Sequence, residues 1–163
     1  VVLDFLRQVT HAWGLEGQLS RQLVAWAARL HEIGLDIAHA QHHRHAAYLL
    51  RHADLAGFSA GEQRLLSALV GNHRRRLRPE LMEGLPSSWT VRARRLAVLL
   101  RLAVLLCRSR SETPLTPITL TARAKSLTLE FPGDWLEAHQ LTLADLRQEA
   151  RYQAASGLRL RYR

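Results

Sequence analysis

The sequence predicts a mainly α-helical protein whose last part is a small ββαβ appendage with an antiparallel sheet. Over residues 1–110 the apolar residues recur at helical spacing, whereas after Pro114 they alternate with polar residues in three short runs. Hydrophobic residues make up 47% of the 163 residues, which is typical of a globular protein and excludes a disordered one. We therefore expect a helical domain over 1–112 and a small α/β appendage over 113–163.

Five or six helices are expected in the first part, because apolar residues three or four apart form one face of a helix. Gly34 follows the second helix, and a loop with proline and glycine, residues 79–88, precedes the fifth. Ser59 and Glu62 have the spacing of a capping box, in which the two side chains satisfy free N–H groups at a helix start. The expected helices cover residues 1–13, 19–30, 39–52, 60–75 and 89–110.

Three strands and one helix are expected in the second part. Apolar residues alternate with threonine, glutamate or arginine over residues 118–122, 127–131 and 158–162, as side chains do on the two faces of a strand. Residues 134–155 are expected to form a helix between the second and third strands. This order predicts a small, mostly antiparallel sheet packed on helix.

The positive charge is concentrated in one stretch of the chain. Lys+Arg total 23 against 14 acidic residues, and Lys125 is the one lysine. Ten arginines lie between Gly71 and Arg110, opposed there by Glu80 and Glu83 alone. The planar guanidinium matches phosphate oxygens, so this concentration favours a polyanionic partner. The alternative is a solvated helix face without a binding role.

Cysteine usage and hydropathy indicate where the protein works. The single Cys107 excludes an internal disulfide and fits a reducing cytoplasm. The most apolar stretch, residues 96–106, is interrupted by Arg101 and is shorter than the roughly 20 residues that a bilayer needs. We expect a cytoplasmic protein without a membrane segment. The chain begins at Val1 within a predicted helix, which suggests a piece of a larger protein.

Seven of the nine histidines lie between His31 and His73, in a pattern that resembles the HD superfamily of helical metal phosphohydrolases. The resemblance implies an HD-like helical fold, but Glu32 and Val104 stand where that family has aspartates. Hard cations need oxygen ligands, so we expect a defunct metal centre with no metal and packed or hydrogen-bonded histidines. The positions that match this degenerate site are His31, Glu32, His45, His73 and Val104.

Longer strings give a closer resemblance. Residues 31–37, 42–50, 54–58, 69–74 and the Phe-Pro-Gly-Asp-Trp turn at 131–135 resemble the second half of the exopolyphosphatase and guanosine-pentaphosphate phosphohydrolase family. The resemblance implies a homodimeric parent that releases terminal orthophosphate from polyphosphate with Mg²⁺. It also implies that the catalytic domains lie in an N-terminal half of the parent, since this chain has no Gly-rich phosphate loop.

The expected function is therefore that of an accessory module without catalytic residues or a cofactor of its own. It binds long-chain polyphosphate and supports dimerisation and processivity, while the N-terminal half performs the hydrolysis. Arg159, Arg161 and Arg163 form a further stripe at strand spacing, either a binding surface or a solvent-facing sheet edge. The residues expected to bind polyphosphate are Arg44, His73, Arg74, Arg75, Arg76, Arg78, Arg92, Arg94 and Arg95.

Two other functions remain open from the sequence. One is an active HD-type phosphohydrolase that holds a divalent metal with its histidines and Glu32. The other is a nucleic-acid-binding domain, which the arginines permit. The four tryptophans mostly occupy core positions rather than stacking platforms, and no helix-turn-helix or zinc-finger pattern occurs, so nucleic acid ranks last.

Overall fold

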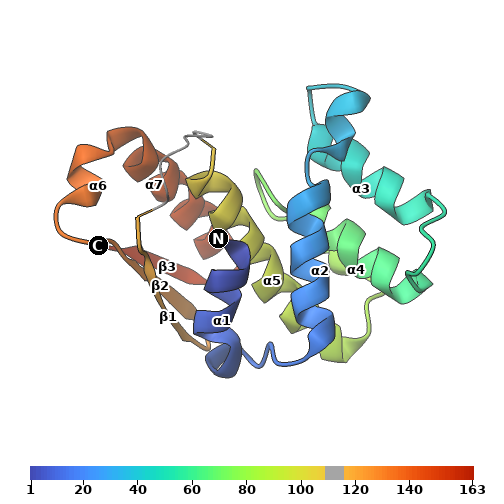
Figure 1. The fold of residues 1–163 in the computed structure, drawn as a ribbon, viewed down its shortest axis with the longest axis horizontal. Coiled ribbons are helices and arrows are strands. Elements are labelled where there is room, and N and C mark those ends of the chain that lie inside the picture. The colour runs from blue at the N-terminus through green and yellow to red at the C-terminus, as the bar shows by residue number, and fades with distance from the viewer. Residues whose placement is uncertain (109–115) are drawn as a thin grey trace.

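A computed structural model describes residues 1–108 and 116–163 of the chain. The first range is helical and the second holds a three-stranded sheet with two helices, so the predicted mainly α-helical class is confirmed (Figure 1). The elements are α1 Val2–Trp13, α2 Gln18–Leu30, the 3₁₀ turn η1 Ile33–Asp36, α3 His42–His52, α4 Ala60–Gly71, the 3₁₀ turn η2 Pro79–Met82, α5 Ser87–Leu106, β1 Thr119–Arg123, β2 Ser126–Glu130, α6 Trp135–Ala138, α7 Gln140–Ala155 and β3 Arg159–Tyr162.

Helix α4 begins as predicted and ends four residues early. The Glu62 N–H donates to Ser59 Oγ at 3.2 Å and the Ser59 N–H donates to Glu62 Oε2 at 2.7 Å, which completes the capping box. After Gly71 the side chain of Asn72 bonds to the backbone of the following loop. Its Oδ1 accepts from the Arg78 N–H at 2.6 Å. Residues 73–78 therefore form a closed loop instead of the expected last helical turn.

The sheet is mixed rather than antiparallel throughout. Strands β1 and β2 pair antiparallel, with Thr119 opposite Glu130, as expected of a hairpin. Strands β2 and β3 pair parallel, with Ser126 opposite Arg159. The helical connection between β2 and β3 is long enough for the crossover that a parallel pair needs. That connection, predicted as one helix over 134–155, is divided into α6 and α7 at His139.

Helix α1 joins the helices to the sheet (Figure 1). Trp13 is fully buried, and its indole N–H donates to the backbone oxygen of Arg123 at 2.9 Å. The side-chain amide of Gln8 donates to Ile118 O and accepts from the Leu120 N–H. Buried residues of the helices and of the inner sheet face form one core. The division into 1–112 and 113–163 stays a prediction, since its boundary lies outside the described residues.

The longest helix, α5, passes through this core. It carries Arg92, Arg94, Arg95 and Arg101 among its 20 residues, and its predicted last residues up to Arg110 lie partly outside the described range. Among the described residues no helix combines the length and the apolar character needed to cross a membrane.

Candidate functional site

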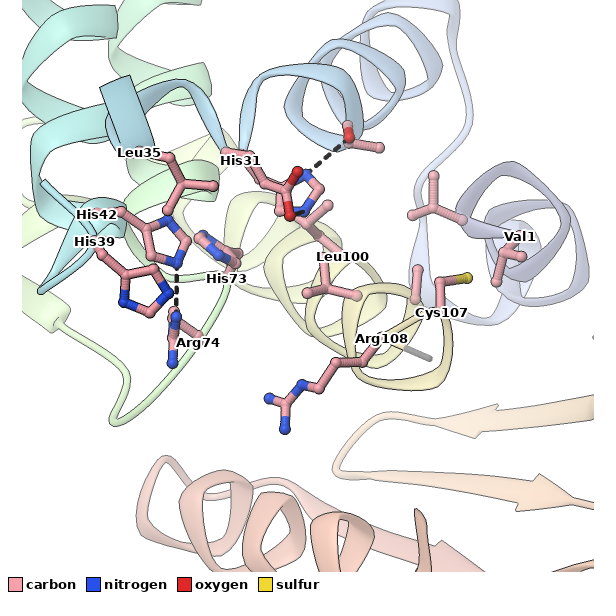
Figure 2. A pocket seen from close by; sticks show the side chains of 15 residues that line it. Val1, His31, Leu35, His39, His42, His73, Arg74, Leu100, Cys107 and Arg108 are labelled. Carbon is pink, nitrogen blue, oxygen red and sulfur yellow. Dashed lines mark hydrogen bonds and ion pairs between the residues drawn. The ribbon is translucent and has the colours of Figure 1, made fainter. Parts of the chain in front are cut away.

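A pocket of about 770 Å³ lies where the starts of α1 and α3, the ends of α2 and α5 and the loop after α4 meet (Figure 2). Its floor is apolar and comes from α1 and α5, with Val2, Leu100 and Ala103 among the lining residues. Its polar lining is rich in imidazoles and guanidinium groups. We call the whole pocket the histidine pocket. Its polar lining residues are His31, Glu32, His39, His42, His73, Arg74 and Arg108.

Gly34 brings the two sides of this pocket together. It lies in η1, directly after His31 and Glu32, and it packs against the first turn of α3. A Cβ atom at this position would clash with the backbone oxygen of His42. Because only glycine permits this approach, His31 from the end of α2 and His42 from α3 line one pocket.

The hydrogen bonds of three histidines fix which ring nitrogen carries the proton. His31 Nδ1 donates to Ala28 O at 2.9 Å and His73 Nδ1 donates to Val70 O at 2.7 Å, because a carbonyl oxygen can only accept. His42 Nε2 lies 2.6 Å from Nη1 of Arg74 and must accept, because a guanidinium can only donate. The His31 and His73 rings meet edge to face, 5.1 Å apart between centroids.

Burial favours the uncharged form of His42, His43 and His73. It lowers the pKa of His73 to about 3. Burial, followed by the charge of Arg74, lowers the pKa of His43 to about 4 and also lowers that of His42. Near neutral pH His42 and His73 therefore line the pocket as neutral imidazoles, and Arg74 and Arg108 add positive charge to its lining.

Four of the five positions matched to a degenerate metal centre line the histidine pocket, namely His31, Glu32, His73 and Val104. His45 does not line it and is half-buried elsewhere on α3, whereas His42, three residues earlier, does. Within the described residues, no three histidine, cysteine or carboxylate side chains are placed to hold a metal ion. Val104 offers no oxygen, so this donor set does not fit a hard divalent cation.

The arginines after α4 form a basic loop beside the pocket, which we define as Arg74, Arg75, Arg76 and Arg78. Arg75 and Arg76 are exposed, whereas Arg74 reaches His42 and Arg78 pairs with Glu80 at 2.8 Å. The charge of Arg44 lowers the pKa of Glu80, the partner of Arg78, so Arg44 of α3 lies near the end of this loop. The structure thus brings Arg44, His73 and the basic loop together, out of the residues expected to bind polyphosphate.

Arg92, Arg94 and Arg95 lie elsewhere. They sit near the start of α5, and nine residues separate Arg92 from Arg101, which is about 14 Å along a helix. Arg95 donates to Trp13 O at 2.7 Å and Arg92 covers the ring of Trp89, so both have packing roles. A helix N-terminus attracts anions to its first turn. Helix α5 begins at Ser87, so these arginines lie beyond that turn.

Arg101 is a site residue that the sequence reasoning did not single out. Its side chain is buried and makes a bidentate ion pair with Glu149 of α7, at 2.6 and 2.7 Å. The same guanidinium donates to the backbone oxygens of Asn72 and Arg75, both at 2.6 Å. Arg101 of α5 therefore fixes the backbone at the start of the basic loop. The available signal was a charged residue within an apolar helix, since a buried charge needs partners.

Comparison with known proteins adds a family to this geometry. The family model described as Ppx/GppA phosphatase, domain III, matches residues 1–150. A guanosine-5'-triphosphate,3'-diphosphate pyrophosphatase of Pseudoalteromonas translucida is 34% identical over 160 residues, covering 98% of this chain and 32% of the relative. Proteins of the same name from Aeromonas salmonicida and Aeromonas hydrophila are 35% and 36% identical over 155 residues, or 95% of this chain and 31% of each relative. The chain thus spans about a third of the length of these relatives.

Proposed function

This chain belongs to the Ppx/GppA phosphatase family, as its domain III, and from that premise we propose that it is the substrate-holding part of an exopolyphosphatase. In this proposal it binds long-chain polyphosphate and supports processivity, while an N-terminal catalytic half of the parent protein releases terminal orthophosphate. The observation that carries the proposal is the basic loop, which holds four arginines and contributes Arg74 to the lining of the histidine pocket.

Polyphosphate is a flexible polyanion without bases to read. A binder needs several positive charges held at fixed positions and little shape specificity. The loop meets this need because Arg75 and Arg76 are exposed, while Arg101 and Asn72 fix the backbone that carries them. Affinity is expected to fall steeply with salt, since each phosphate contact releases a counterion.

The pocket supports binding rather than cleavage. Among the described residues that line it, Glu32 is the one carboxylate, and this described donor set does not fit a catalytic metal ion. A chain held here stays near the catalytic half, which raises its effective concentration there. Long chains are therefore released less often between successive cuts.

The apolar floor favours a second candidate ligand. The relatives are named for a guanosine substrate with phosphates at both its 5' and 3' positions. Val2, Leu100 and Ala103 offer an apolar wall for a base, beside the arginines that would take the phosphates. Saturable binding of a guanosine pentaphosphate that exceeds binding of polyphosphate would favour this ligand over the first.

A titration with long-chain polyphosphate over a salt series tests the proposal. The variant Arg75→Asn/Arg76→Ser removes the two exposed loop charges, and asparagine tolerates the positive φ of 59° at position 75. Losing two phosphate contacts makes the plot of log affinity against log salt shallower, by about 1.4 in slope. Unchanged affinity and slope in this variant would refute the proposal.

The matched control is Arg92→Ser/Arg94→Ser, which removes the same charge near the start of α5. Its binding is expected to stay close to that of the unsubstituted chain. An equal loss in both variants, or equal binding of a charge-matched single-stranded DNA, would reduce the interaction to net charge alone.

We also propose that the parent protein is a homodimer and that its catalytic half uses Mg²⁺. A chelator is then expected to stop orthophosphate release by the parent and to leave polyphosphate binding by this chain intact. Sedimentation equilibrium of the parent checks the dimer, and a monomer at all concentrations would refute that part.

A further inference from the structure

The outward face of the sheet is a second basic surface. The pairing of the three strands aligns Arg123, Ser126 and Arg159 in one row across the sheet. Thr121, Thr128 and Arg161 form the next row. Side chains alternate between faces along each strand, so the leucines of the same strands point into the core. The outward face therefore carries arginines beside rows of hydroxyl groups.

Two adjoining hollows lie over this face, with volumes of about 590 and 690 Å³. Both are lined by Arg123, Ser126 and Arg161, so the two hollows meet at these three side chains. They share no lining residue with the histidine pocket. This surface is consequently separate from the one used in the proposed function.

Helix α7 adds charge along one side of the hollows. Ala150 and Ala154 line them, and the exposed Arg147 and Arg151 lie on the same helix face by the 3.6-residue period. Among the described residues that line the hollows, Glu130 is the one acidic side chain, and it pairs with Arg163. The basic sheet surface is defined as Arg123, Lys125, Arg147, Arg151, Arg159, Arg161 and Arg163.

We infer that the basic sheet surface is a second binding site for a linear condensed-phosphate chain. Five cations line the hollows with one described carboxylate, Arg147 and Arg151 lie on the adjoining helix face, and the serine and threonine hydroxyls supply further donors to phosphate oxygens. Of the described residues that line either hollow, Tyr162 is the one aromatic residue, and it alternates with the arginines, so these described linings offer no platform for stacked bases. The choice of phosphate rests on the proposed function, whereas the surface itself does not.

Two separate surfaces on one chain make the binding of a long ligand bivalent. A short phosphate chain occupies one surface at a time. A chain long enough to reach both binds the second surface intramolecularly, which raises its apparent affinity by about a hundredfold or more. The affinity is therefore expected to rise steeply once the phosphate chain exceeds a threshold length.

Size-fractionated polyphosphates, titrated by fluorescence anisotropy against the chain, test this inference. The variant Arg159→Ser/Arg161→Ser is expected to lose most of the gain of long chains over short ones, at least about tenfold. The control Arg21→Ser/Arg51→Ser removes the same charge at exposed positions of α2 and α3 and is expected to keep the gain. Long-chain affinity that is unchanged in the β3 variant would overturn the inference.

A variant of opposite sign guards against a loss caused by misfolding. Glu130→Gln removes the carboxylate from this face and frees Arg163, so polyphosphate affinity is expected to rise about two- to fivefold. No rise in a folded Glu130→Gln protein would contradict a phosphate site on this face. Equal affinity for a charge-matched single-stranded DNA would also overturn it, in favour of a nucleic-acid surface.

The loop variant Arg75→Asn/Arg76→Ser separates this inference from the proposed function. If the loop variant loses binding and the β3 variant does not, the second site fails and the proposed function stands. If the β3 variant alone loses binding, the second site stands and the basic loop is not the substrate-holding element.

Discussion

Arg101 shows at the scale of one residue how a buried charge is held. Its guanidinium meets Glu149 at 2.6 and 2.7 Å, and Gln153 donates to the same carboxylate at 2.6 Å. Two further guanidinium N–H groups donate to the backbone oxygens of Asn72 and Arg75. Removing one partner of such a pair leaves the other charge buried without compensation, which costs more than the pair itself contributes.

Arg101→Met is therefore expected to lower the free energy of unfolding by about 3–5 kcal/mol. The double variant Arg101→Met/Glu149→Met removes both charges and is expected to recover part of that loss. Urea denaturation at pH 7 measures both variants. A double variant that is no more stable than Arg101→Met would show that the unpaired Glu149 charge is not the cause.

The buried imidazoles make stability depend on pH. Burial lowers the pKa of His73 to about 3, below its usual value of 6.5, so the unfolded chain binds the proton more readily between these values. The contribution of His73 to the free energy of unfolding is thus fully present above pH 6.5, and it is lost as the pH drops toward 3. His43, with a pKa of about 4, acts in the same direction over pH 6.5–4.

His73→Asn is expected to reduce this pH dependence, because asparagine does not titrate and its amide can still donate to Val70 O. Urea midpoints at pH 7.5 and pH 5 measure the change. The control is His52→Asn, which removes an exposed imidazole instead of a buried one. If the urea midpoint of His73→Asn falls between pH 7.5 and pH 5 as much as that of the unsubstituted chain, His73 is not a source of the pH dependence.

At the scale of elements, close approach of η1 and α3 depends on one glycine. Gly34→Ala places a Cβ against the backbone of His42, so one of the two elements has to move. We expect a loss of about 1–3 kcal/mol in the free energy of unfolding. Gly61→Ala in α4 is the matched control: its Cβ meets only Ser59 Oγ at 3.9 Å, and a gain of about 0.5–1 kcal/mol is expected. Thermal denaturation of both variants decides, and equal effects would contradict the packing argument.

Much of the element order could be predicted from periodicity and caps. The Ser59 capping box, the five helices and the three strands all follow from residues close in sequence. The parallel pairing of β2 with β3 did not follow, because alternation marks a strand and says nothing about the direction of its neighbour. The early end of α4 depends on Asn72 binding the Arg78 N–H, a bond between residues in a loop.

The site was less accessible from the sequence than the fold. Three histidines of α3 lie within four residues, and a small rotation of the helix decides that His42 rather than His45 lines the pocket. The partner of Arg101 lies 48 residues away in α7, and no local pattern indicates it. Local charge density likewise grouped the arginines of the loop with Arg92 and Arg94, which the length of α5 separates.

At the scale of the whole molecule, the helices and the sheet depend on each other. Trp13 and Gln8 of α1 bind backbone groups at both ends of β1, and Arg101 of α5 binds Glu149 of α7. These contacts cross the predicted boundary between residues 112 and 113. A single cooperative unfolding transition is therefore expected.

Scanning calorimetry checks this, with equal calorimetric and van 't Hoff enthalpies as the expected result. Unfolding curves followed by tryptophan fluorescence and by far-UV circular dichroism are expected to coincide. Two separated transitions would instead support two independently folding units.

The uneven amino-acid usage places two unique reactive groups at two separate sites. Lys125 is the one lysine, and it is exposed in the turn between β1 and β2, on the basic sheet surface. Cys107 is the one cysteine, and it is exposed at the edge of the histidine pocket. Once the terminal amine of Val1, which lines the histidine pocket, is blocked, a thiol-directed dye and an amine-directed dye therefore label the two separate surfaces without any engineered residue. Energy transfer between the two dyes then measures the distance between the two surfaces, with and without a bound ligand that spans both.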